Sequence, residues 1–152
     1  MRNDRSFLKI LQLAVLATWE LARARAALAR IGPGDVLERN AQAASAGLPE
    51  PSVAKRTRDE RICAEIAFAI TAMARRVPWR SDCLAQALAG QTWLARKRIG
   101  SEIVVGATIE RDSNFEAHAW LVRDGKVLLG GDVARYRVLL DNTSSPPDCT
   151  PL

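Results

Sequence analysis

The sequence predicts an α+β fold, in which N-terminal helices pack on a small antiparallel sheet. Apolar residues recur at helical spacing over the first hundred residues, whereas from residue 102 they alternate with a period of two. Asp124-Gly125 is a strong hairpin-turn signal between two of the alternating stretches. A chain of 152 residues, 48% hydrophobic and 26% charged, has the length and composition of about one soluble globular domain.

The first predicted helix covers residues 6 to 30. Its polar residues follow one stripe, and these are Arg5, Lys9, Gln12, Glu20, Arg23 and Arg30. The rest of the circumference is apolar, which is wider than a lone surface helix shows and indicates packing on more than one neighbour. A helix that docks on a membrane surface or on a partner is the alternative. Residues 32–51 are rich in Gly, Pro, Ala and Ser, and are typical of a connector with room for one helical turn.

Two further helices are predicted before the sheet. The second, residues 52 to 76, places Cys63 beside an apolar stripe, where it is expected to be buried; the stripe consists of Ile62, Ile66, Ile70, Met73 and Val77. Ser81 or Asp82 is a good N-cap for the third helix, and Gly100 is the glycine expected to end it.

Strands are predicted at residues 102–110, 115–122 and 126–130, and residues 134–140 are a candidate fourth strand. The last residues, "DNTSSPPDCTPL", lack a core-forming pattern. We therefore expect an N-terminal helix and connector over 1–57, a core over 58–141 and a flexible tail over 142–152.

The formal net charge is +5, with a pI near 9.6, and arginine clusters supply much of the surplus. This charge favours anionic partners, or simply solubility. Nucleic acid is a poor candidate, because the basic residues are dispersed and the few aromatic residues are not interleaved with them.

Three cysteines, Cys63, Cys83 and Cys149, form no CxxC pair, and one histidine is too few for a Cys/His zinc set. We therefore predict no metal, no cofactor and a reducing cytoplasmic location. The apolar run "ILQLAVLATW" is too short to span a bilayer. Charged residues separate it from the following "ALA", which argues against a secretory signal.

Cys83 and His118 are the candidate catalytic pair. Cys83 falls in the first turn of the third predicted helix, where free backbone N–H groups and the positive end of the helix dipole favour a thiolate. His118 falls in the middle of a strand, on the same face as Trp120 and Val122. A buried small cysteine and a packed strand histidine are the alternatives. An imidazole beside a cysteine at a helix start is the minimum apparatus for acyl transfer through a thiol.

Asp132 is the preferred third group, which would accept a hydrogen bond from the imidazole. A strict two-residue turn at 124 and 125 puts Gly131 opposite His118 and leaves Asp132 on the wrong face. One extra residue corrects this register. We therefore predict either a bulge near Gly130-Gly131 or a three-residue turn.

The stretches "PWRSDCLAQALAGQTWLARKRIGSEIVVGATI" and "FEAHAWLVRDGKVLLGGD" resemble the B2 peptidase of lasso-peptide biosynthesis, a transglutaminase-like cysteine protease. The resemblance covers roughly residues 58 to 140 and includes the order Cys, His, Asp. It implies a transglutaminase-like or papain-like core that removes the leader from a ribosomally made precursor peptide. Cys83 would be the nucleophile, His118 the base and Asp132 its orienting group.

The same resemblance implies a precursor peptide as substrate, a separate leader-binding B1 protein and an ATP-dependent cyclase that closes the lactam ring. The backbone N–H of Cys83 is the expected oxyanion donor, with Gln86 or Trp79 as candidates for a second one. Two other functions stay open. The same three residues suit transglutaminase-like acyl transfer to an amine, and a non-catalytic scaffold for the precursor or cyclase would use Cys83 and His118 for packing alone.

Overall fold

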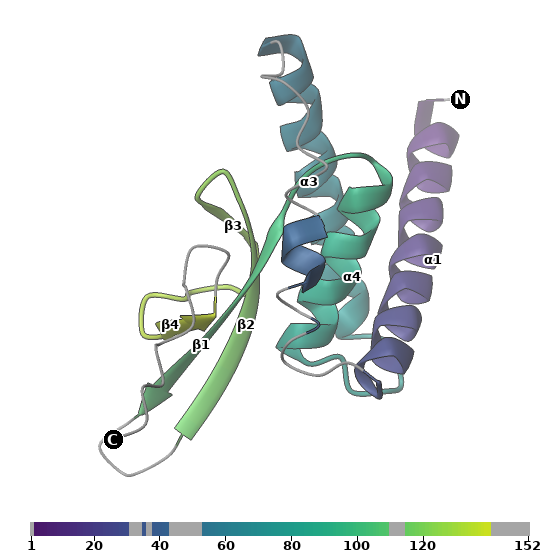
Figure 1. Ribbon diagram of the computed structural model, residues 1–152. Coiled ribbons are helices and arrows are strands. Elements are labelled where there is room, and N and C mark those ends of the chain that lie inside the picture. Colours follow the sequence, from purple (N-terminus) through teal and green to yellow (C-terminus); the bar gives the residue numbers. More distant parts are fainter. Residues whose placement is uncertain (1, 31–34, 36–37, 43–52, 110–114, 141–152) are drawn as a thin grey trace, which may run out of the picture.

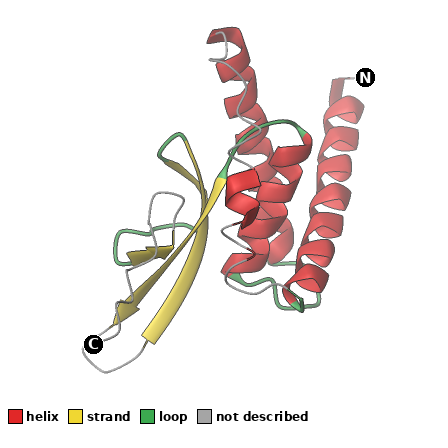
Figure 2. Cartoon of the chain, viewed as in Figure 1, coloured by secondary structure: helices red, strands yellow, loops and turns green. Residues whose placement is uncertain are grey.

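A computed structural model describes residues 2–30, 35, 38–42, 53–109 and 115–140 of the chain. Within these residues the helices form one layer and the strands another, as Figure 2 shows. The predicted α+β class is therefore confirmed. The tail from residue 141, which includes Cys149, lies outside the described residues.

The helical layer contains α1 (Arg2–Leu28), α3 (Val53–Ala74) and α4 (Cys83–Arg96), which lie side by side in Figure 1. Helix α1 packs on both α3 and α4, as the width of its apolar surface predicted. In α3, Ile66, Ile70 and Cys63 are buried. Ile62 and Met73, together with Val77 just after the helix, pack against the same core. The core stripe and the buried position predicted for Cys63 are thus confirmed.

Helix α1 differs from the prediction in two ways. Glu20, assigned to the polar stripe, is buried and pairs with the guanidinium of Arg96 on α4. The face of α1 away from its neighbours exposes large apolar side chains, among them Phe7, Leu8, Leu11, Val15 and Trp19. No helix in the described part of the chain is both long and apolar enough to cross a membrane.

Helix α4 begins after the N-cap Asp82, one of the two predicted caps, but its end was predicted wrongly. The helix stops at Arg96, and Arg98, not Gly100, takes the left-handed conformation with φ of 58°. The Ile99 N–H donates to Leu94 O at 3.0 Å, and the Arg98 N–H donates to Ala95 O at 2.9 Å. These two bonds form a Schellman motif, which buries Ile99 in the core.

The sheet has the order β3-β2-β1-β4, and neighbouring strands run antiparallel. The strands are β1 (Glu102–Ile109), β2 (Phe115–Arg123), β3 (Lys126–Leu129) and β4 (Arg137–Leu140). All four predicted strands are present, although β4 begins three residues later than predicted. Asp124 and Gly125 both have positive φ, 48° and 74°, so the predicted two-residue turn joins β2 to β3.

One face of the sheet packs on α4. A Cβ placed on Gly90 of α4 would lie 2.8 Å from a methyl carbon of Leu121 and 2.7 Å from one of Leu129. Because side chains alternate along a strand, the neighbouring His118 and Trp120 of β2 lie on the outer face, away from the helices. This is the arrangement expected from the alanines that flank His118.

Asn40, in a helical segment over 38–42, is almost completely buried and bonds to the backbone of β1. Its side-chain amide donates to Ile103 O at 2.7 Å, and its oxygen accepts from Ile103 N–H at 2.9 Å. Gln91 of α4 donates to the same oxygen at 2.7 Å. The amide of Asn40 therefore pairs with β1 as one residue of a neighbouring strand would.

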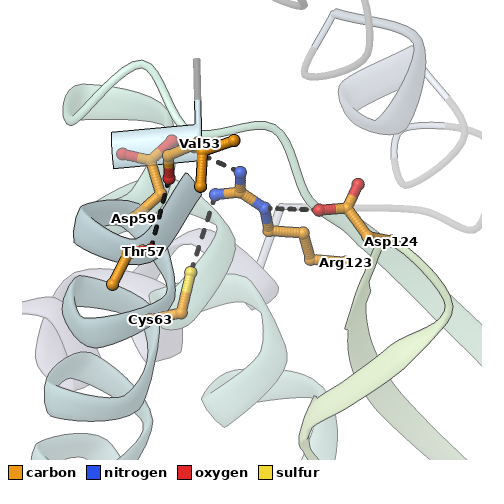
Figure 3. Close-up of polar contacts among 6 residues, drawn as sticks. All are labelled: Val53, Thr57, Asp59, Cys63, Arg123 and Asp124. Atoms are coloured by element: carbon orange, nitrogen blue, oxygen red, sulfur yellow. Dashed lines mark hydrogen bonds and ion pairs between the residues drawn. The ribbon is translucent and has the colours of Figure 1, made fainter. Parts of the chain in front are cut away.

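Arg123, at the end of β2, ties the hairpin to α3, as Figure 3 shows. Its guanidinium contacts Asp59 at 3.3 Å, the Cys63 sulfur at 3.7 Å and Asp124 at 3.1 Å. Burial raises the pKa of the Cys63 thiol above its ordinary value, and the nearby guanidinium opposes this only in part. Cys63 is therefore held as a neutral thiol.

Candidate active site

Cys83 is the first residue of α4 and is half-buried. The N-cap Asp82 accepts the backbone N–H of Gln86 at 3.0 Å but makes no side-chain capping bond. The first N–H groups of a helix have no partner within the helix. Cys83 therefore lies at the positive end of the α4 dipole, as the sequence predicted.

Two side chains near Cys83 were candidates for a second oxyanion donor. The amide of Gln86 donates to Ser81 O at 2.8 Å. The indole nitrogen of Trp79 is buried without a hydrogen-bond partner in the described part of the chain. One donor of Gln86 is thus occupied by the loop that precedes α4, whereas the Trp79 N–H is unused.

His118 is half-buried on the outer face of β2, where one ring nitrogen has a fixed partner. Nε2 lies 2.7 Å from Gly130 O. A carbonyl oxygen only accepts hydrogen bonds, so Nε2 carries the proton in the neutral ring. The other nitrogen, Nδ1, is then the basic atom that can take a proton from a thiol.

The contact between His118 and Gly130 depends on a bulge in β3. Arg123 pairs with Lys126 and Val122 with Val127, but Leu121 pairs with Leu129, so β3 contains one extra residue. The predicted bulge is therefore present, although it lies before Gly130-Gly131. Gly130 has φ of 120° and Gly131 has φ of 70°, conformations that favour glycine.

Asp132 follows this glycine pair on the exposed surface. Its carboxylate accepts the backbone N–H of Ala134 at 3.0 Å. The ring nitrogen that Asp132 was expected to hold is bonded to the backbone two residues earlier. The role of Asp132 as the orienting group stays a prediction.

Helix α4, which begins at Cys83, packs against β2, the strand that carries His118. The contacts of the His118 ring are with Gly130, Trp120 and Tyr136, all on the outer face. Among the described residues no hydrogen bond joins the Cys83 sulfur to this ring. The pairing of Cys83 with His118 therefore also stays a prediction.

Sequence reasoning missed two contributors to the site, the carbonyl of Gly130 and the ring of Tyr136. The Gly130-Gly131 pair was singled out only as a place for a bulge. Tyr136 is the one tyrosine of the chain, and this rarity was the only signal for it. Its ring stacks on His118 with centroids 4.7 Å apart.

The sequence profile described as the transglutaminase-like superfamily matches residues 17–141. The chain belongs to this superfamily. No curated protein and no solved structure matches it significantly. The superfamily match begins inside α1 and covers all of the described sheet.

The transglutaminase-like superfamily has a fold of the type used by cysteine peptidases and acyltransferases, which agrees with the coarse class inferred from Cys83 and His118. The superfamily match begins at residue 17, whereas the resemblance to B2 peptidases begins at about residue 58, so the match includes more of the N-terminal region. The domain boundaries at 57/58 and 141/142 stay predictions.

Proposed function

We propose that this protein is a cysteine peptidase that removes the leader from a ribosomally made lasso-peptide precursor. The observation that carries the proposal is the position of Cys83, at the first residue of a helix in a transglutaminase-like chain. The choice of a lasso-peptide precursor as substrate rests on two features of the sequence. These are the order Cys83, His118, Asp132 and the resemblance of the surrounding stretches to B2 peptidases.

In the proposed reaction His118 Nδ1 takes the thiol proton, and the Cys83 sulfur bonds to the carbonyl carbon at the leader–core junction. The amide C–N bond then breaks, and the imidazolium returns the proton to the leaving amine. Water hydrolyses the resulting thioester and releases the leader as a carboxylic acid. The backbone N–H of Cys83 stabilises the oxyanion, and Asp132 is proposed to orient the imidazole.

The reaction requires the sulfur to reach Nδ1. That approach is itself part of the proposal. The bond from Nε2 to Gly130 supports only the proton transfer, because it leaves Nδ1 as the unprotonated nitrogen. We propose further that the peptidase works in the reducing cytoplasm, with a separate leader-binding B1 protein and an ATP-dependent lactam-forming cyclase.

The test is to incubate the purified protein with the precursor peptide, with and without B1, and to identify fragments by mass spectrometry. We expect separate leader and core masses from the parent protein and none from Cys83→Ala. The matched control is Cys63→Ala, because Cys63 is buried beside Arg123 and has no proposed role in the reaction. Cleavage that persists in Cys83→Ala would rule out this nucleophile.

Acyl transfer to an amine is the second candidate, because it uses the same thioester. Adding a primary amine to the assay separates the two reactions by product mass. A leader whose new C-terminus carries the amine indicates a transferase, and a free acid indicates a peptidase. Binding of the precursor without either product would favour the scaffold.

A further inference from the structure

His118 is the one histidine of the chain, and a general base must present the correct nitrogen in a fixed direction. The bond from Nε2 to Gly130 O restrains one end of the ring. A planar ring held by one hydrogen bond can still rotate about that bond. A second restraint is needed to aim Nδ1.

Tyr136 supplies a contact of the required kind. Its ring stacks on the imidazole with centroids 4.7 Å apart and planes 23° apart. Trp120 lies on the same strand face, with its centroid 6.0 Å from the imidazole and 6.2 Å from the Tyr136 ring. The imidazole therefore belongs to a cluster of three rings on the outer face of the sheet.

Tyr136 is itself held at its far end. Its hydroxyl donates to Glu116 Oε1 at 2.7 Å, and Arg135 Nη2 donates to the same hydroxyl at 2.7 Å. Arg135 also bonds to Glu116 at 3.1 Å, and its guanidinium carbon lies 5.0 Å from the centre of the Tyr136 ring. The bond to the Glu116 carboxylate raises the pKa of Tyr136 above its ordinary value, so the phenol stays a donor.

The backbone adds a further restraint. The N–H of Tyr136 donates to Val133 O at 3.0 Å, which closes a turn directly before β4. Glu116 and His118 lie two residues apart on β2 and so share a face. Tyr136 thus extends along that face, with its hydroxyl at Glu116 and its ring over His118.

We propose that Tyr136 is a positioning residue, anchored by Glu116 and Arg135, which holds the His118 imidazole in the orientation that bonds Nε2 to Gly130 O and so keeps the proton on Nε2. The inference rests on the proposed role of His118 as the base. Tyr136 acts through His118 and has no part in bond making itself.

The direct test is the tautomer of the imidazole, read from the ¹⁵N chemical shifts of its two ring nitrogens at a pH where the ring is neutral. The single histidine gives one unambiguous pair of signals. We expect the parent to hold its proton on Nε2, and Tyr136→Leu to give a mixture of both tautomers. Tyr136→Phe keeps the ring and loses its anchor, so its mixture should be intermediate.

The matched control is Leu139→Thr, which alters an exposed residue of β4 at its register shift and keeps all three rings. It should retain the parent spectrum, which separates loss of the stack from loosening of β4. If Tyr136→Leu does not fold, Glu116→Gln replaces it, because it keeps both rings and weakens the anchor. An unchanged tautomer ratio in the folded variant would overturn the inference.

The precursor assay gives a second readout. We expect Tyr136→Leu to lower kcat by about tenfold or more, with KM within about twofold, because misdirecting a catalytic group affects the chemical step rather than binding. A parent-like kcat in this variant would also overturn the inference. A parent protein that fails to cleave the precursor would instead overturn the proposed function, whereas the tautomer ratio, measured without substrate, still decides whether Tyr136 orients the ring.

Discussion

Substitution of Gly130 by alanine tests the geometry behind His118 most sharply. At this residue φ is 120°, outside the narrow left-handed region open to other residues. An added Cβ would lie 2.3 Å from Trp120 Cβ and 3.0 Å from Trp120 Cα. The second of these atoms is backbone, so no change of side-chain rotamer relieves the contact. The segment that carries the Gly130 carbonyl must therefore move.

The size of the effect follows from two contributions. A residue forced into a sparsely populated backbone conformation costs about 1–3 kcal/mol, and overpacking costs about 1–3 kcal/mol. We expect Gly130→Ala to lower the free energy of unfolding by about 2–6 kcal/mol. In a chain of this size that corresponds to a Tm lower by roughly 4–24 °C.

Gly131→Ala is the matched control, because φ there is 70° and an added Cβ would meet no atom within 4 Å. Its expected cost is only about 1 kcal/mol. Thermal unfolding followed by circular dichroism gives both Tm values, and the ¹⁵N shifts of His118 report whether its bond to the carbonyl survives. Equal Tm values for the two variants, or a Gly130→Ala protein with the parent His118 spectrum, would refute the reasoning.

Two further predictions concern other parts of the fold. Arg98→Gly should raise the free energy of unfolding by about 0.5–1 kcal/mol, because the left-handed residue of the Schellman motif then has no Cβ. Chemical denaturation measures this free energy, and a loss of stability would contradict the assigned helix end. Because the folded-state pKa of Cys63 is raised, its contribution to stability is complete below the ordinary thiol pKa and is lost as the pH rises through the raised value. Denaturation across the window above about pH 8.5 should therefore show a steeper decline for the parent than for Cys63→Ala, and parallel curves would contradict the burial of a neutral thiol.

Local patterns predicted the helices and strands of this fold well. Helix and strand periodicity and the Asp124-Gly125 turn each depend on residues that are close together in the sequence. Pairings between distant residues were not predictable in the same way. The burial of Glu20 depends on Arg96, which lies on another helix. Gly100 is the better left-handed residue by propensity, but burial of Ile99 places Arg98 in that conformation instead.

In the candidate site, too, local features were predictable from the sequence and contacts between distant residues were not. The position of Cys83 at a helix start and of His118 within a strand followed from caps and alternation. The need for one extra residue in β3 also followed from counting the register. The bond from His118 to a carbonyl of Gly130 did not, because a backbone atom carries no signature in the sequence. The stack with Tyr136 depends on how the segment after β3 folds back over the sheet.

Asn40 has a consequence for how this protein meets other chains. Strand β4 pairs with β1 only from residue 105 to 107, so the backbone of Ile103 would otherwise present an open template for a foreign strand. A single carboxamide satisfies both of its polar groups. The backbone of Ile103 therefore cannot pair with a strand of a second copy. An extended peptide that binds through its backbone would have to pair at another part of the sheet.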